Sequence, residues 1–337
     1  MKKLVLLGFA AAAMLAGCNR NEVLEQNAEN AIAFNQSFVE NMTKSNDYNG
    51  ENLPASMLYG AMVTPENKAF YPFDQKKIEA NGSYTPVQYW LPGATYTFTA
   101  FAPYETAAQL TYTKPAAADA NDDNRGTLAF DNSTFDGEVD LMKAVCPQFT
   151  FDAAKSAKTV NLNFEHQLCR LRFKFDNALG TDAYKLRISG LKVANAVKAT
   201  AFDVAQGNDV NEAETFTLNF ATTETVEGQE VEYLIGNNMS LETDHKYLIA
   251  NEGDLKVEFK IEMIQYDINN VAHVAKTFNY TGDNAVVLSA FNMEKGHSYR
   301  LAVELNAGNI DPDGQMEPIE FTVTTDEWGA WNETIIK

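Results

Sequence analysis

The residue with the most specific chemistry is a cysteine near the start of the chain. Cys18 ends the tetrapeptide Leu15-Ala16-Gly17-Cys18, in which a branched apolar residue and two small residues precede a thiol. This pattern is the lipobox of lipoproteins, whose thiol carries diacylglycerol and acyl chains such as palmitate. Upstream, Lys2 and Lys3 precede an apolar run from Leu4 to Leu15, which is too short to span a bilayer. We therefore expect residues 1–17 to be a lipoprotein signal peptide and Cys18 to be the lipidation site. An ordinary signal with a chance cysteine is the alternative.

The other reactive side chains form no recognisable catalytic or redox pattern. The sequence lacks the GxSxG, HExxH, P-loop, GxGxxG and CxxC motifs, and its four histidines are far apart in the chain. Cys146 and Cys169 could pair in an oxidising compartment, or could be two small buried residues. We therefore expect no enzyme activity, no catalytic residue, no cofactor and no metal. A surface hydrolase built on undistinguished carboxylates is the enzymatic alternative.

One acidic stretch comes close to a calcium-binding loop. Oxygen-bearing residues alternate at Asn309, Asp311 and Asp313, then a glycine follows, and Glu320 comes later. The first position is Asn rather than Asp, Pro312 stiffens the loop, and strand-like sequence flanks it. This is a weak calcium candidate, and a simple turn between two strands is favoured.

Charge and composition exclude several classes of protein. Among 337 residues, Asp and Glu number 46 and Lys and Arg 26, so the formal net charge is −20. Removal of Lys2 and Lys3 with the signal lowers it by two, to −22. Nucleic acids are therefore excluded as partners, because they require a basic surface. The hydrophobic fraction of 45% is that of a folded protein with a sizeable core.

The spacing of apolar residues predicts an all-β fold. Apolar and polar residues alternate over most of the chain, with turn-forming clusters between the runs, and helical periodicity is scarce. Such strands without intervening helices favour β-sandwiches. A polar, glycine-containing turn at 176–183 predicts a boundary near residue 180, and hence domains over 18–180 and 181–337. The clearest alternating runs are Tyr96–Phe101, Val160–Phe164, Leu171–Phe175, Leu255–Met263, Tyr299–Leu305 and Ile319–Thr324.

Several blocks, in order along the chain, carry a resemblance to a known family. Their most distinctive residues are Trp90, Pro92, Pro103, Asp140, His166, Tyr299 and Trp328. They lie in the blocks Tyr89–Pro92, Tyr96–Pro103, Val139–Ala144, Leu162–Leu168, Lys295–Tyr299 and Ile319–Trp328. Together, behind a lipobox, these blocks resemble the fimbrillins, which are subunits of protease-assembled pili.

The resemblance implies a fold, a location and a mode of assembly. Fimbrillins have two transthyretin-like β-sandwich domains with Greek-key connections and are exported as outer-membrane lipoproteins. A protease removes the lipidated first strand, and a strand from another fimbrial subunit fills the groove by donor-strand exchange. The resemblance thus implies a cell-surface fimbrial (pilus) subunit or anchor that supports adhesion to a host or bacterial ligand. It also implies that the distinctive motif residues, His166 among them, are structural.

The sequence departs from the family pattern at both ends. The cleavage site is expected at an arginine that follows Thr after the first strand, here placed at 31–34, yet Lys44 stands at that position. Arg20 is the other candidate, but cleavage there would leave the first strand in place. The chain is also short after Trp328. Candidate donor-strand residues near this end are Ile319, Phe321, Val323, Trp331 and Ile335.

A second function remains open on the sequence alone. The chain could be a surface lipoprotein that does not polymerise and that binds a glycan or host ligand through exposed Tyr and Trp rings. Alternation suggests that most of these rings belong to the core, which favours the fimbrial interpretation.

Overall fold

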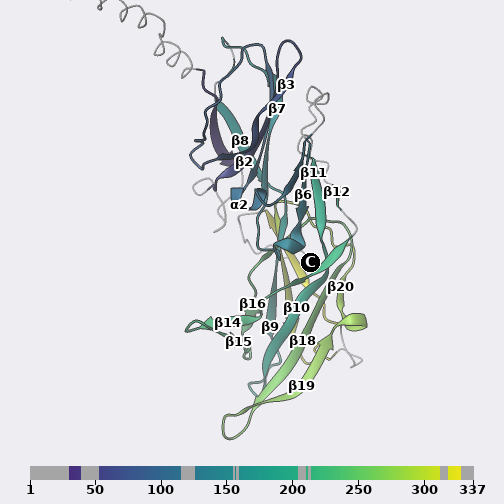
Figure 1. Ribbon diagram of the computed structural model, residues 1–337. Helices are drawn as coiled ribbons and strands as arrows, with labels where there is room; N and C mark the ends of the chain where they lie inside the picture. Colours follow the sequence, from purple (N-terminus) through teal and green to yellow (C-terminus); the bar gives the residue numbers. More distant parts are fainter. Residues whose placement is uncertain are drawn as a thin grey trace, which may run out of the picture.

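The computed structural model describes residues 30–38, 53–114, 126–154, 156, 159–203, 210–211, 214–311 and 318–327. Within these ranges the fold is all-β, as predicted, with one short helix, α2 (Tyr104–Ala107), and two 3₁₀ turns, η2 (Asn132–Thr134) and η3 (Gly282–Asn284). The molecule is elongated, with β2, β3, β7 and β8 at one end, β6, β11 and β12 in the middle, and β9, β10, β18 and β19 toward the other end (Figure 1).

The N-terminal end is built on a six-stranded sheet. Its order is β1 (Ala33–Phe38), β8 (Thr159–His166), β7 (Met142–Thr150), β4 (Thr95–Ala102), β2 (Ser56–Val63) and β3 (Ala69–Ile78). Along β8 exposed and buried residues alternate strictly, so that Val160, Leu162 and Phe164 point into the core. This is the period of two that the sequence predicts.

The C-terminal end contains two larger sheets. One has the order β13 (Thr215–Asn219), β10 (Lys185–Val197), β18 (Leu255–Tyr266) and β19 (Ala272–Tyr280), with β20 (Val286–Leu288) beside β18. The other has the order β16 (Ser240–Glu242), β9 (Cys169–Asn177), β21 (His297–Leu305) and β22 (Thr322–Glu327), with β17 (Lys246–Leu248) beside β9. One core cluster holds the inward residues of both sheets, including Phe173, Phe175 and Phe259.

A four-stranded sheet joins segments from both halves of the chain. Its order is β12 (Val210–Asn211), β11 (Ala199–Asp203), β6 (Thr127–Asp131) and β5 (Thr111–Thr113). A third core cluster here combines Phe101 and Phe130 with Phe202 and Tyr247, so early and late strands share one buried apolar region. The two ends are therefore connected by packing as well as by the chain.

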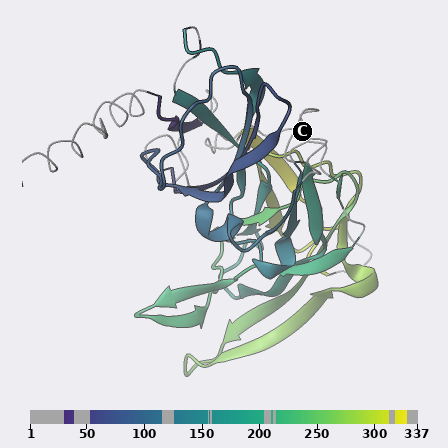
Figure 2. The same cartoon turned by 45° about the horizontal axis from the view of Figure 1, so that its top comes forward.

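Two hairpins extend beyond the sheets at the C-terminal end. One is β14 (Thr223–Val226) with β15 (Gln229–Glu232), and the other is the outer part of β18 and β19. Both project from the body of the molecule on the same side (Figure 2). Ile268, at the turn between β18 and β19, is fully exposed.

Strand pairing bears on the predicted boundary near residue 180. That position lies between β9 and β10, and both strands contribute to the same C-terminal core cluster. β9 pairs with β16, β17 and β21, all of which lie later in the chain. The division into 18–180 and 181–337 remains a prediction.

Candidate functional site

The first described strand lies at the edge of the N-terminal sheet. β1 pairs in parallel with β8, from Ala33 opposite Thr159 to Phe38 opposite Phe164. Side chains add to this ladder, because Asn35 donates to Asn161 over 3.3 Å and Ser37 donates to Asn163 over 2.7 Å. The sequence expectation of a strand at 31–34 agrees with this placement: Ala31 forms an isolated bridge and Ala33 begins the strand.

Two side chains from this segment fill the N-terminal core. Phe34 is 6% exposed, and its ring meets Phe73, Tyr84 and Phe98 edge-on at centroid distances of 5.3, 5.4 and 5.6 Å. Ile32 is 2% exposed. Burial of such side chains contributes roughly 1.5–3 kcal/mol each. Removal of this segment would therefore leave an apolar groove beside β8.

A second segment holds the same strand from its other side. We call residues 79–90 the strap. The Ile32 amide donates to the Gln88 carbonyl over 2.9 Å, and the Trp90 amide donates to the Asn30 carbonyl over 2.8 Å. Further along, the Gln36 side chain donates to the Glu79 carbonyl over 2.6 Å. β1 is thus held between β8 and the strap, an arrangement that alternation in the sequence did not predict.

The tryptophan of the predicted motif anchors the end of the strap. Trp90 is 4% exposed, stacks on Phe151 at 4.7 Å and meets Tyr96 edge-on at 4.7 Å. Pro92 follows it in an exposed turn, and Pro103 directly precedes helix α2. The burial of Trp90 supports a packing role for this residue, whereas Pro92 lies in a turn at the surface.

Two other motif residues, far apart in the sequence, meet in a buried hydrogen bond. Nδ1 of His166 lies 2.8 Å from Oδ1 of Asp140, and both side chains are almost fully buried. The Gln167 amide donates to the Leu141 carbonyl over 2.8 Å and fixes the two segments together. The pair holds the end of β8 against the start of β7 and faces no described nucleophile or metal group.

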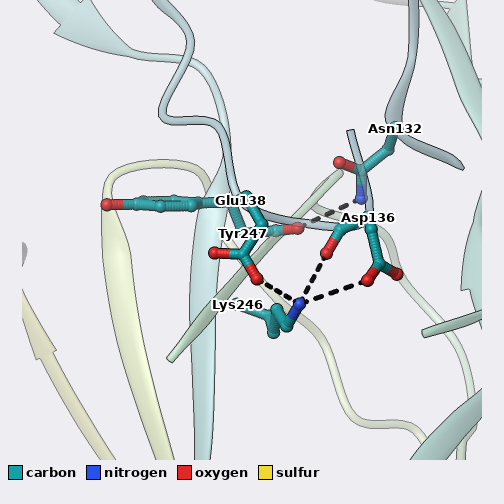
Figure 3. Close-up of polar contacts among 5 residues, drawn as sticks. All are labelled: Asn132, Asp136, Glu138, Lys246 and Tyr247. Carbon is teal, nitrogen blue, oxygen red and sulfur yellow. Dashed lines mark hydrogen bonds and ion pairs between the residues drawn. The ribbon is translucent and has the colours of Figure 1, made fainter. Parts of the chain in front are cut away.

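A lysine of β17, Lys246, contacts the loop that follows η2 and so connects the later half of the chain to the earlier half (Figure 3). Lys246 Nζ donates to the Asp136 carbonyl over 2.9 Å and pairs with the carboxylates of Asp136 and Glu138. Backbone contacts support it: the Tyr247 amide donates to the Gly137 carbonyl over 2.7 Å, and Asn132 donates to the Tyr247 carbonyl over 3.1 Å. The sequence analysis did not predict this contact, although the dipeptide Asp136-Gly137 is typical of a turn.

Some of the candidate residues near the C-terminus lie in the core, and others lie outside the described residues. Tyr299 is buried, and its hydroxyl accepts the Glu294 amide over 2.8 Å. Ile319 is buried, Phe321 packs on Phe173 at 5.8 Å, and Val323 lies in β22 opposite Leu301. Several candidates lie outside the described residues: Cys18, Arg20, Lys44, Trp328, Trp331 and Ile335.

The calcium candidates already have other partners. The Asn309 side chain donates to the Glu304 carbonyl over 2.8 Å and accepts the Asn306 amide over 2.9 Å, while Asp311 pairs with Lys276. Glu320 is exposed, and Asp313 lies outside the described residues. In the described part of the chain, no group of three or more His, Cys, Asp or Glu residues could hold a metal ion.

Cys146 and Cys169 form no disulfide with each other. Cys146 lies in β7 within the N-terminal core, and Cys169 lies in β9 within the C-terminal core. Cys169 is fully buried, and this burial raises the pKa of its thiol to about 12. The sequence left a disulfide open, and the fold puts the two thiols in separate cores.

No helix among the described ranges is long and apolar enough to cross a bilayer.

A solved structure shares this fold at low sequence identity. A fimbrial protein from Bacteroides vulgatus aligns with a TM-score of 0.62 at 14% identity, over 89% of this chain and 99% of that chain. A candidate cell adhesion protein from Parabacteroides distasonis aligns with a TM-score of 0.48 at 11% identity, over 90% of this chain and 99% of that chain. No curated protein matches the sequence.

A family-level comparison covers most of the chain. The sequence profile described as fimbrillin-like matches residues 41–328. The match extends from β2 to β22 and includes the whole of the C-terminal motif block, Ile319–Trp328. The resemblance inferred from the motif blocks is thereby confirmed: the chain belongs to the fimbrillin-like family.

Proposed function

We propose that the chain is a structural subunit of a fimbria on the cell surface, in the shaft or as its lipid anchor, and that it supports adhesion. The observation that carries the proposal is the position of β1. It is an edge strand, it is held mainly by one neighbouring strand and the strap, and its side chains fill a groove in the core. A strand from another subunit can replace such a strand without disturbing the rest of the sheet.

The order of the chain decides which cleavage frees the groove. Residues 30–38 precede Lys44, so cleavage after Lys44 would separate β1 from the folded body. Cleavage after Arg20 would release the lipid at Cys18 and leave β1 attached. The shaft subunit therefore requires cleavage at or near Lys44, and the anchor retains Cys18 and its acyl chains in the outer membrane.

The donor strand is best assigned to the end of the chain. Ile319 and Phe321 are part of their own core, so a donor role would require their removal from it. Trp331 and Ile335 are four positions apart, so an extended segment would present both on one face. We assign the donor residues to this segment. Repeated head-to-tail contacts of this kind build a filament.

Exposed aromatic rings favour the fimbrial role over glycan binding. Phe70, Tyr89 and Tyr266 are exposed, and they lie on β3, on the strap and at the end of β18 respectively. A sugar-stacking platform needs rings on one surface, and these three lie on separate elements. The remaining large aromatic clusters belong to the cores.

Cleavage-site variants test the proposal. The protein is recovered from the native outer membrane as wild type, Lys44→Ala and Arg20→Ala, and each is examined by intact mass and unheated gel electrophoresis. We expect detergent-resistant oligomers in the wild type. A shaft subunit loses them in Lys44→Ala and keeps them in Arg20→Ala, whereas an anchor keeps Cys18 and enters mixed oligomers in all three. Monomers in all three variants would refute the proposal.

A further inference from the structure

The strap touches the backbone of β1 as well as its side chains. Gly82 has a φ of +82°, and its amide donates to the Glu79 carbonyl over 2.7 Å, which closes a tight turn. A methyl group on Gly82 would lie 2.1 Å from the carbonyl oxygen of Phe34. Only glycine therefore allows the strap to approach the strand this closely.

A tyrosine of the strap contacts the strand two residues earlier. The Tyr84 hydroxyl donates to the carbonyl of Ile32 over 2.8 Å and accepts the amide of Gln88 over 3.1 Å. Its ring meets the rings of Phe34 and Phe73 edge-on, each at 5.4 Å. Burial raises the pKa of Tyr84 above its ordinary value, so the hydroxyl keeps the proton that it donates.

These contacts favour one register of the strand over the registers that are shifted by one residue. A slip by one residue would turn the buried side chains outward, because successive side chains of a strand point to opposite faces. Ala33, between the two buried residues, is exposed. The groove thus accommodates an aliphatic residue at the position of Ile32 and an aromatic ring two residues later.

We propose that Gly82 and Tyr84 set the register of whatever strand occupies this groove. The occupant is an extended segment with an aliphatic residue whose carbonyl accepts the Tyr84 hydroxyl, followed two positions later by an aromatic residue that passes Gly82. β1 meets this requirement with Ile32 and Phe34. The extension to a strand from a second subunit rests on the proposed function, whereas the clamp on β1 does not.

Hydrogen exchange tests the clamp on the chain that begins at Cys18 and is not cleaved at Lys44, because this chain retains residues 30–38. The variants are Tyr84→Phe, which removes one hydroxyl, and Gly82→Ala, with Gly180→Ala as its matched control. Gly180 also has a positive φ, of +69°, but a methyl group there would meet no atom within 4 Å. Exchange is followed by mass spectrometry at residues 30–38, with β21 as the internal reference.

The expected result is local. Tyr84→Phe speeds exchange in residues 30–38 by roughly twofold to tenfold, the effect of one hydrogen bond, and leaves β21 unchanged. Gly82→Ala has a larger effect on the same residues, and Gly180→Ala has none there. Unchanged exchange of β1 in both strap variants would overturn the proposal. If Gly82→Ala unfolds the protein, the exchange rate of residues 30–38 in Tyr84→Phe alone tests the proposal.

An assembly assay separates this inference from the proposed function. Detergent-resistant oligomers are measured for the same chains after maturation. Oligomers that form at the wild-type rate in both strap variants would refute the clamp for the partner strand and leave the fimbrial role intact. Absence of oligomers in every chain, with faster exchange of β1 in the strap variants, would refute the fimbrial role and leave the clamp on β1 intact.

Discussion

His166 and Asp140 form a buried hydrogen-bonded pair that joins two strands of the N-terminal sheet. The imidazole Nδ1 lies 2.8 Å from the carboxylate Oδ1, and the side chains are 1% and 2% exposed. The two residues belong to separate motif blocks, and the fold places them at the junction of β7 and β8. Their burial explains why a histidine can be characteristic of a structural protein.

Loss of the imidazole should destabilise the fold strongly. His166→Ala leaves the Asp140 side chain buried without its imidazole partner, and loss of the hydrogen-bond partner of a buried polar group costs about 1–3 kcal/mol. Urea unfolding gives the measurement. His273→Ala is the control, because His273 contacts Asp267 on the exposed β18–β19 turn. Equal losses in the two variants would contradict a structural role for the buried pair.

Truncation of Phe34 should loosen β1. Phe34→Ala removes the ring that meets three aromatic neighbours, and such core truncations cost about 3–5 kcal/mol. The loss should be seen first as faster protease cleavage and hydrogen exchange in residues 30–38. Phe70→Ala removes the same group from a ring that is 49% exposed, and should leave both rates unchanged. Similar behaviour of the two variants would show that Phe34 does not hold the strand.

A methyl group at Gly137 should disturb the contact between the loop that follows η2 and β17. It would lie 2.9 Å from Leu218 Cδ1 and 3.0 Å from the Tyr247 carbonyl, at a φ of +67°. Gly180→Ala carries the same conformational cost, about 1–2 kcal/mol, without a contact. Gly137→Ala should therefore lower the free energy of unfolding by more than Gly180→Ala and speed exchange at β17. Equal effects would show that the close approach has no energetic role.

Stability should fall at alkaline pH. Burial raises the pKa of Cys169 from 9.0 to about 12 and that of Tyr299 from 10.0 to about 12. Between the ordinary and the raised pKa values, these two groups release their protons in the unfolded chain and keep them in the folded chain. Rising pH therefore favours unfolding. Full stability is expected below pH 9, with progressive loss from pH 9 toward 12.

The urea midpoint at several pH values measures this loss. Cys169→Ala and Tyr299→Phe each remove one of the two groups, and each should flatten the alkaline decline. Tyr266→Phe, at an exposed site, should leave the decline as in the wild type. A decline of the same steepness in all the variants would assign it to other groups.

The sequence predicted the parts of the fold that depend on local pattern. Alternation located β8 and β9, because half-buried strands need apolar residues at every second position. The motif blocks led to Trp90, Asp140, His166 and Tyr299, which all proved to be buried. These features depend on neighbours in the chain or on residues with a distinctive side chain.

Features that depend on distant pairing could not be predicted. β1 pairs in parallel with β8 and β9 with β21, across more than a hundred residues in each case. The strap contacts at Gly82 and Tyr84, and the approach of Lys246 to Asp136, likewise join segments that no local pattern relates. Periodicity specifies which face of a strand is buried, but it does not specify which other strand pairs with it.

Long-range strand pairing also bears on the domain boundary that the sequence predicts near residue 180. The turn after β9 resembles a linker in composition, yet β9 pairs with β16, β17 and β21. We propose that the boundary lies at Gln167 and Leu168, between β8 and β9. Cleavage in the 178–184 turn should then leave β9 bound to the C-terminal part, and its release with the N-terminal part would contradict this boundary.

The most direct test of the account is the covalent and oligomeric state of the chain on the surface of the native cell. Intact mass with N-terminal sequencing, applied to bands from unheated gels, gives both. The account predicts detergent-resistant oligomers that heat dissociates, containing a chain that begins at Ser45 in a shaft subunit or at acylated Cys18 in an anchor. A chain found only as a monomer that begins at Cys18 would contradict assembly by strand exchange.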